Sequence, residues 1–312
     1  MTTGRVVVGG EALADLVPTD ASQGALSPLL PRLGGGPFNT AIGLARLGTP
    51  VSMLTRLSTD AFGDALTARL DDHGVDISLV QRGPEPTTLA VVTVTASGAA
   101  RYSFHVEGAA DRTVADPGPL PDDTVALAVG TLSLILEPGA MVYAAVAARE
   151  AAAGRFVSLD PNVRPALATD PDAVRARLDA IAAGAGLVKL SDEDAEWWGR
   201  TPADLLAGGT AAVVLTRGPD GLGVRAAAAG SVDVPAARGH PLVDTIGAGD
   251  TVHAALLAWL HAHDLFDRGR LAALDAAGWT AALRHAATAA AITCSRAGAE
   301  PPYASELARS VS

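Results

Sequence analysis

The chain has 312 residues, a net charge of −11 and one cysteine, Cys294. Hydrophobic residues make up 49% and charged residues 18%, which is enough apolar material for a sizeable core and too little charge for a disordered chain. The acidic balance argues against nucleic acid as a partner, and a single thiol excludes an intrachain disulfide and a multi-cysteine zinc site.

The first residues, MTTGRVVVGGEALADL, lack the long apolar region of a signal peptide. No later run of eighteen apolar residues without charge follows, so no membrane span is expected. We therefore expect a cytoplasmic protein that has no membrane partner.

Apolar and amphipathic runs alternate along the chain. Short runs rich in β-branched residues predict strands at 6–8, 51–57, 125–129, 156–159, 187–190 and 212–216. Amphipathic runs predict helices at 41–47, 62–73, 140–153, 172–183, 192–199, 250–263 and 271–293, the last with a break. This βαβ order predicts a parallel sheet covered by helices on both faces.

Two segments are typical of β-hairpins. The runs 87–95 and 101–106 are β-rich and partly polar, and the segment 96–100 would form the turn between them. We interpret this hairpin as part of a small sheet that projects from the main body as a lid. The run 221–234 predicts a second hairpin.

The sharpest motif is the run 244–251, DTIGAGDT, directly before an amphipathic helix. Glycine at 247 and 249 removes the Cβ atoms that would block an anion, and the N–H groups of a helix start converge on such an anion. Asp250 falls in the first turn, where a carboxylate could take a hydroxyl proton while the N–H groups stabilise a transferring phosphoryl group. Alternatively, the glycines only shape a turn and Asp250 caps the helix. The run is neither a Walker A loop nor a dinucleotide fingerprint.

With a second motif, this run resembles the ribokinase-like (PfkB) family of sugar kinases, and the resemblance covers nearly the whole chain. The run 34–41, GGGPFNTA, is similar to the family's N-terminal glycine motif, and 244–250 is similar to its DTxGAGD motif. The resemblance implies an α/β fold, a doubly wound α/β/α sandwich with a small β-sheet lid. It implies one kinase domain over 1–312, with lid strands from about 10–17, 31–36 and 87–107.

The resemblance also implies ATP as the phosphoryl donor, Mg²⁺ and, in many members, a monovalent cation. The residues that match the anion hole and the catalytic base are Gly247, Ala248, Gly249 and Asp250. The run SDED at 191–194 lies where many members have N-x-x-E. The short Asp194 side chain favours a water-mediated contact with the metal, although a helix N-cap with an acidic first turn explains the same run equally well.

The nucleotide and cation sites follow from the same resemblance. The run TRGPDG at 216–221 is similar to a T-x-G-x-x-G nucleotide loop, although an ordinary turn would also fit. The residues expected to bind ATP are Lys189, Ser191, Thr216, Gly218, Gly221, Gly247, Gly249 and Ala287. The residues expected around a potassium ion are Asp244 and the backbone near Ile246, Thr293, Arg296 and Gly298. Pro302 stands where some members have a serine ligand, so the potassium requirement stays open.

The sugar is expected at the strand ends and under the lid. The residues assigned to it are Asp15, Gly34, Gly35, Asn39, Phe104, Asn162, Arg164 and Asp250. The runs GEALAD at 10–15 and RYSFHVE at 101–107 are similar to bacterial fructokinases, which implies that Asp15 accepts hydrogen bonds from sugar hydroxyls. Asn39 could also cap its helix, Phe104 could belong to lid packing, and Arg164 could bind a phosphate or the carboxylate of a sugar acid.

The sequence therefore predicts an ATP-dependent kinase that phosphorylates a hydroxyl of a small sugar, with fructose as the first choice. The alternatives are a kinase of the same fold for 2-keto-3-deoxygluconate, ribose or a nucleoside, and a non-catalytic sensor of sugar or nucleotide. An exposed edge of the lid sheet could pair with a second copy of the chain, so a homodimer is a further expectation.

Overall fold

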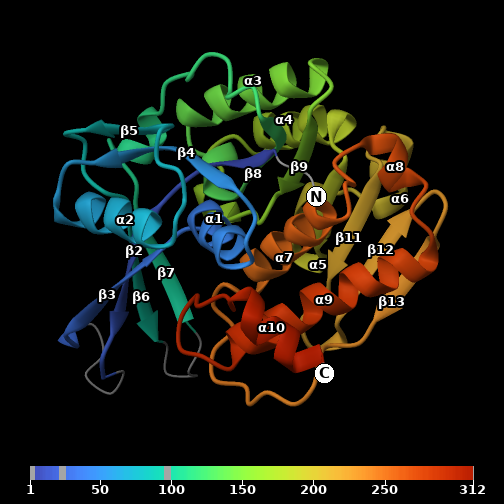
Figure 1. Cartoon of the computed structure of the whole chain (residues 1–312). Coiled ribbons are helices and arrows are strands. Elements are labelled where there is room, and N and C mark those ends of the chain that lie inside the picture. Colours follow the sequence, from blue (N-terminus) through green and yellow to red (C-terminus); the bar gives the residue numbers. More distant parts are fainter. Residues whose placement is uncertain (1–3, 21–25, 95–99, 312) are drawn as a thin grey trace.

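The computed structural model describes residues 4–20, 26–94 and 100–311, which form a layered body and a smaller sheet beside it (Figure 1). The body is built on a nine-stranded sheet in the order β13-β12-β11-β10-β9-β8-β1-β4-β5. Its strands are β1 (Arg5–Gly9), β4 (Val51–Ser58), β5 (Val80–Gly83), β8 (Thr124–Gly130), β9 (Phe156–Asp160), β10 (Leu187–Ser191), β11 (Ala212–Thr216), β12 (Leu222–Ala226) and β13 (Gly230–Val234). From β5 at one edge of the sheet to β11, all neighbouring strands pair in parallel. At the other edge, β12 and β13 add an antiparallel hairpin.

Helices cover both faces of this sheet. Val6 and Val8 of β1 belong to one hydrophobic core and Val7 to the other, because successive strand residues point to opposite faces. The first core includes α1 (Gly36–Arg46), α2 (Ala61–Asp72), α7 (Ala248–Ala262), α8 (Arg268–Ala272), α9 (Ala276–Cys294) and α10 (Ala304–Val311). The second includes α3 (Gly139–Ala152), α4 (Pro171–Gly184), α5 (Asp192–Trp198) and α6 (Pro202–Ala207). This layer order confirms the predicted doubly wound α/β/α sandwich.

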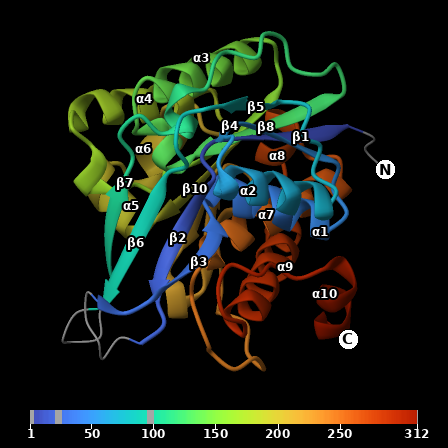
Figure 2. The same cartoon turned by 90° about the vertical axis from the view of Figure 1, so that its left-hand side faces the viewer.

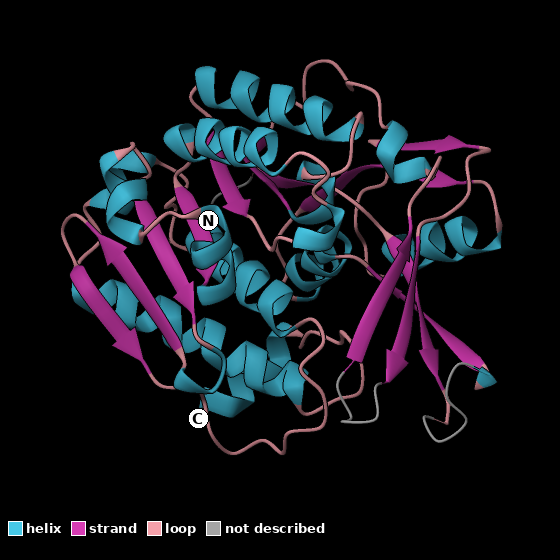
Figure 3. Ribbon diagram, turned by 180° about the vertical axis from the view of Figure 1, so that it is seen from behind, coloured by secondary structure: helices cyan, strands magenta, loops and turns pink. Residues whose placement is uncertain are grey.

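A second sheet projects from the body next to α1 and α2 (Figures 2 and 3). It has four strands in the order β3-β2-β6-β7, namely β2 (Leu13–Pro18), β3 (Leu29–Gly34), β6 (Leu89–Val94) and β7 (Ala100–His105). Strands β2 and β6 pair in parallel, and the other two pairs are antiparallel. The predicted turn of the β6–β7 hairpin falls largely on 95–99, outside the described residues.

Helix α1 begins five residues earlier than expected. The sequence analysis placed its start at residue 41, after the glycine run, whereas the helix starts at Gly36 with Gly35 as its N-cap. Gly35 has φ of 115°, a conformation that favours glycine, and Pro37 fits the first helical turn because its missing N–H would have no partner there. Asn39 is therefore inside the helix, and the alternative that it caps α1 is wrong.

The chain reverses its winding direction between β1 and β8. From β1 it proceeds to β4 and β5 on one side, and from β8 it proceeds to β9, β10 and β11 on the other. In open parallel sheets, ligands bind at the carboxyl ends of the strands beside such a reversal. Within the described part of the chain, no helix has the length and apolar character needed to cross a membrane.

Candidate active site

A cleft of about 410 Å³ lies at this edge of the sheet, between the body and the small sheet. Residues from both sheets and from the start of α7 line it. The predicted site residues that line it are Asp15, Gly35, Phe104, Asn162, Arg164, Lys189, Ser191, Asp194, Thr216, Ile246, Gly247, Gly249 and Asp250. Those that do not are Gly34, Asn39, Gly218, Gly221, Asp244, Ala248, Ala287, Thr293, Arg296 and Gly298.

Asp250 lies where the starts of α1 and α7 meet. Its side chain is buried, and Asn39 Nδ2 donates a 2.8 Å hydrogen bond to its Oδ2 atom. A Cβ atom on Gly36 would lie 3.3 Å from Oδ1, so the carboxylate also contacts the first turn of α1. Among the described residues, no hydrogen bond is donated to Oδ1. This oxygen is therefore the one that can accept a proton from a ligand in the cleft.

The surroundings of Asp250 make its carboxylate a stronger base. Burial raises its pKa to about 6, against the opposing effect of the Asn39 hydrogen bond. The negative charge of Asp160 raises the pKa further, whereas the positive charges of Lys189 and Arg164 lower it. A carboxylate with a pKa near 6 is largely ionised at neutral pH and accepts a proton more readily than an exposed aspartate.

The turn before α7 is closed tightly against the loop after α9. Gly247 is the N-cap of α7 and has φ of 74°, and a Cβ atom there would lie only 2.5 Å from Ala299 Cβ. Both the conformation and the contact require glycine. Ala248 N donates a 3.2 Å hydrogen bond to Thr245 O, whereas among the described residues neither Gly247 N nor Gly249 N has such a bond. The N–H groups of these two glycines, at the start of α7, are therefore available to an anion in the cleft.

Asp194 lies in the first turn of α5 and forms a capping box with Ser191. Its Oδ1 atom accepts a 2.7 Å hydrogen bond from Val163 N, and its Oδ2 atom accepts bonds from the backbone N–H and the hydroxyl of Ser191. Among the described residues, no cluster of three or more His, Cys, Asp or Glu side chains could hold a metal ion. Because protein donors already engage both oxygens of Asp194, this carboxylate fits a contact with a metal through water.

Asp244 links the α7 turn to the loop that follows α9. One of its oxygens accepts a 2.9 Å hydrogen bond from Ile246 N, and the other accepts a 2.9 Å bond from Gly298 N. The Arg296 side chain points elsewhere, because it pairs with Glu306. Thr293 is fully buried and its hydroxyl contacts that of Thr251. The residues expected near a monovalent cation are thus grouped around two adjoining loops.

The lid end of the cleft combines a carboxylate with aromatic rings. Burial raises the pKa of Asp15 to about 6, while the charge of Arg164 lowers it. Arg164 Nη1 donates a 2.7 Å hydrogen bond to Asn162 Oδ1. Tyr102 and Phe104, two residues apart on β7, stack with ring centroids 6.0 Å apart, and both line the cleft. Gly34 on β3 lies beside Asp15, because a Cβ atom at residue 34 would be 2.8 Å from Asp15 Oδ2.

Sequence reasoning missed Glu11 and its partner Thr131. Glu11 is buried between β1 and β2, accepts hydrogen bonds from the Thr131 hydroxyl and Ser133 N, and lines the cleft. Burial raises its pKa to about 7. A glutamate directly after two glycines at a strand end was a signal for this position, but its partners lie more than a hundred residues away in the sequence.

The chain is similar to known sugar kinases over most of its length. The family model for pfkB family carbohydrate kinases matches residues 3–306. A fructokinase of Rhizobium leguminosarum bv. trifolii is 40% identical over 279 residues, which are 85% of this chain and 82% of the relative. A fructokinase of Klebsiella pneumoniae is 34% identical over 321 residues, which are 99% of each chain.

The fold agrees with that of a solved relative. The crystal structure of fructokinase with bound ATP from Xylella fastidiosa superposes with a TM-score of 0.88 at 27% identity, over 98% of each chain. The family match, the relatives and the superposition identify the same kind of phosphotransferase, one that acts on a sugar hydroxyl. The chain belongs to the pfkB family of carbohydrate kinases.

Proposed function

We propose that this kinase transfers the γ-phosphoryl group of ATP to a primary hydroxyl of fructose, with Asp250 as the general base. The observation that carries the proposal is the placement of the Asp250 carboxylate: it is buried, held by Asn39 and directed into the cleft beside the start of α7. The fructokinases among the relatives support fructose as the acceptor.

The chemistry follows from what the two ends of the cleft offer. The sugar lies under the lid, and its hydroxyl donates its proton to Asp250 Oδ1 as the oxygen attacks the γ-phosphorus in line. The N–H groups of the turn 247–249 stabilise the negative charge that develops on the phosphoryl group. ATP extends over the ends of β10 and β11, where Lys189, Ser191 and Thr216 line the cleft.

We expect Mg²⁺ to accompany the nucleotide. Asp194 would hold it through water, because the hydrogen bonds from Val163 and Ser191 already engage the carboxylate. Glu193, which also lines the cleft, is the other carboxylate on α5 that the metal can reach through water. A bound Mg²⁺ offsets charge on the phosphate oxygens. The Asp244 region is the place we propose for a monovalent cation, since two adjoining loops converge there.

A neutral sugar fits the lid end better than a sugar acid. Asp15 already balances part of the Arg164 charge. The Arg164 charge lowers the pKa of Asp15, whereas burial raises it. A substrate carboxylate placed beside Arg164 would therefore meet a second negative charge nearby. This balance favours fructose over 2-keto-3-deoxygluconate.

A substrate panel tests the proposal. Fructose, ribose, 2-keto-3-deoxygluconate and adenosine are each incubated with Mg²⁺ and ATP, ADP release is followed, and the phosphorylated product is identified by mass spectrometry and NMR. Fructose is expected to give the largest kcat/KM. If the enzyme prefers 2-keto-3-deoxygluconate or adenosine, that compound and not fructose is its acceptor. Absence of ADP release with every acceptor would support a non-catalytic sensor.

A further inference from the structure

Lys189 is the only lysine in the sequence. The chain has 23 Lys and Arg residues, and every one except Lys189 is arginine. Lys189 lies on β10, is 3% exposed and lines the active-site cleft. Lysine carries a compact point charge, whereas the guanidinium group of arginine is larger and planar. In a chain that uses arginine at all its other basic positions, a buried lysine indicates a local need for a compact ammonium group.

The ammonium group lies against the turn that is expected to receive the phosphoryl group. A Cβ atom on Gly249 would be 3.7 Å from Lys189 Nζ. The charge therefore lies at the N-terminal end of α7, beside Gly249, the residue that precedes Asp250. Its charge is one of those that act on the Asp250 carboxylate. A cation at this position adds to the attraction that the backbone N–H groups exert on an anion.

Asp160 anchors this ammonium group from the neighbouring strand. Lys189 Nζ donates a 2.8 Å hydrogen bond to Asp160 Oδ1, and the side chains of both residues are 4% exposed. The bond occupies one of the three N–H donors of the lysine and leaves two. Because Lys189 also lines the cleft, these donors are available to a ligand there.

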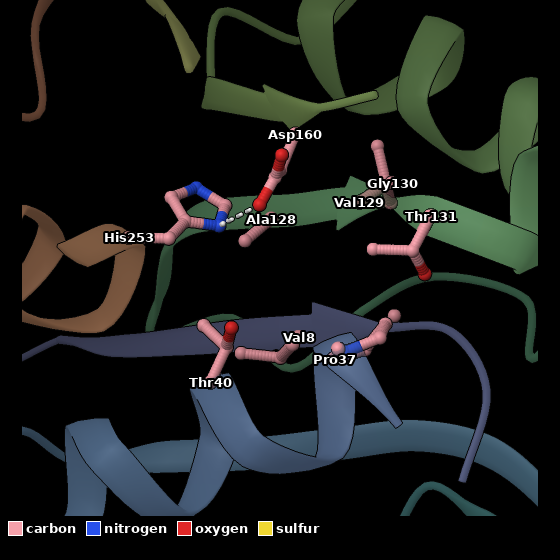
Figure 4. Close-up of a pocket in the computed structure, with 11 residues that line it drawn as sticks. Val8, Pro37, Thr40, Ala128, Val129, Gly130, Thr131, Asp160 and His253 are labelled. Atoms are coloured by element: carbon pink, nitrogen blue, oxygen red, sulfur yellow. Dashed lines mark ion pairs between the residues drawn. The ribbon is translucent and has the colours of Figure 1, made fainter. Parts of the chain in front are cut away.

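A neutral histidine lies beside the Asp160 oxygen that does not bond Lys189. His253 Nδ1 lies 3.9 Å from Asp160 Oδ2 (Figure 4). His253 Nε2 lies 2.7 Å from the Ser158 hydroxyl. Burial and the nearby Lys189 charge lower the pKa of His253 to about 3, so the ring is uncharged at neutral pH. A cavity of about 10 Å³ beside this pair has room for about one water molecule. The charge of Asp160 is therefore directed to Lys189, with little screening by solvent.

We propose that Asp160 is a positioning residue: it keeps Lys189, which is already expected to bind ATP, charged and directed at the α7 turn, where the lysine donates to the phosphoryl group during its transfer. The proposal rests on the kinase function proposed above and adds a side-chain cation to the backbone donors of the turn. His253 and Ser158 support Asp160 from behind.

The charged groups around Lys189 give the proposal a measurable pH dependence. Burial opposes its positive charge, but the charge and hydrogen bond of Asp160 outweigh burial, and Asp194 of α5 and Asp250 of α7 raise the lysine pKa further. His253, also on α7, contributes no charge at neutral pH. In Asp160→Asn the largest stabilising partner is lost, so the lysine pKa falls. The ammonium group then loses its proton as pH rises, and the rate falls with it.

The rate of fructose phosphorylation against pH is the first test. For Asp160→Asn, we expect kcat to fall at least ~10-fold between pH ~7 and pH ~9, a range in which the parent enzyme stays level, because a buried lysine without its counter-charge loses its proton at lower pH. Asp179→Asn is the matched control, since the same substitution there removes the ion pair of Asp179 with Arg200 on a remote surface, and its profile should follow that of the parent enzyme. A level profile for Asp160→Asn, or an equal loss at every pH, would overturn the proposal.

The single lysine also allows its titration to be observed directly. Protein labelled with [¹³C]lysine gives one side-chain Cε signal, which needs no assignment by mutation. We expect this signal to titrate at a clearly lower pH in Asp160→Asn than in the parent enzyme. The same titration midpoint in both proteins would contradict the role of Asp160, whatever the kinetics show.

Two further variants separate chemistry from folding. Lys189→Met should lose about 100-fold in kcat at every pH without a new alkaline decline, because it has no proton to lose. The double variant Asp160→Asn, Lys189→Met carries no unpaired buried charge, so it should fold even where Asp160→Asn does not, and it should be as inactive as Lys189→Met. Near-normal turnover of Lys189→Met would overturn the role of the lysine. A parent enzyme inactive on all acceptors would instead reject the proposed function, while the NMR titration would still test the Lys189–Asp160 pair.

Discussion

The two ends of the cleft differ in burial and in the elements that build them. At the phosphoryl end, Asp250, Lys189 and Asp160 are each less than a tenth exposed and stand on strand ends and a helix start of the body. At the sugar end, Tyr102 is 48% exposed and stands on a four-stranded sheet. Preorganised charges are strongest where water is excluded, whereas a surface that admits a substrate must stay accessible. Substitutions at the first end should therefore change kcat, and those at the second should change KM for the sugar.

The largest effect is expected for Asp250→Asn. The amide cannot take the hydroxyl proton, so kcat should fall by about 1,000-fold, within the range that general-base catalysis supplies. KM for fructose should change little, because the side chain keeps its shape and its contact with Asn39. Steady-state kinetics with fructose and ATP measure both constants, and near-normal turnover would remove Asp250 from its role.

Asp15→Asn should have the next largest effect, and it should change KM for fructose rather than kcat. A charged hydrogen-bond acceptor for sugar hydroxyls is replaced by a neutral one, so KM for fructose should rise about 10- to 100-fold while KM for ATP stays the same. If Asp15→Asn lowers kcat and leaves KM for fructose unchanged, the division of roles between the two ends of the cleft is wrong. Arg164→Met provides a companion variant, since it removes the charge that lowers the Asp15 pKa.

The pH dependence of kcat sharpens the description of the phosphoryl end. Because the pKa of Asp250 is raised to about 6 and the base must be ionised, kcat should fall as pH decreases through about 6. The Asn39 hydrogen bond lowers that pKa, so Asn39→Ala should move the acid limb to higher pH and reduce kcat about 10-fold at pH ~6.5. If the acid limb of the kcat profile does not move in Asn39→Ala, Asn39 does not affect the pKa of Asp250.

The smallest effect is expected for Tyr102→Ala on the lid. Half of this ring is in solvent, and its contact with Phe104 is one aromatic pair, worth about 1 kcal/mol, so KM for fructose should rise about 2- to 5-fold with kcat unchanged. Phe104→Ala, which removes the less exposed ring of the pair, should raise KM more. A decrease in kcat larger than the increase in KM would contradict the division between the two ends.

Local sequence patterns predicted most of the body. Continuous apolar runs such as 6–8 and 212–216 mark buried parallel strands, and glycines at 48 and 74 end the first two helices with positive φ. The edge strand β5 and the short helix α6 were not anticipated, because with four and six residues each is too short to show a clear period. The glycine run before residue 41 suggested a loop, although its last glycine already belongs to α1.

Only those parts of the site that belong to a sequence motif could be predicted. The turn 244–250 identified Asp250, but no local pattern indicated that Asn39, 211 residues away, would hold its carboxylate. The same holds for Lys189 and Asp160, whose pairing depends on the order of the strands in the sheet. Ala287 was assigned to the nucleotide site, yet it is buried in α9 and does not line the cleft, so its role stays a prediction.

The scarcity of lysine has a practical consequence for work with this protein. Amine-directed cross-linkers, dyes and acylating agents find no lysine side chain on the surface, since the one that exists lies 3% exposed beneath the α7 turn. In Asp160→Asn, in which the lysine would lose its proton at lower pH, an amine-reactive analogue of ATP would therefore modify one side chain inside the cleft. Peptide mapping of that adduct would report directly on how closely the nucleotide approaches Lys189.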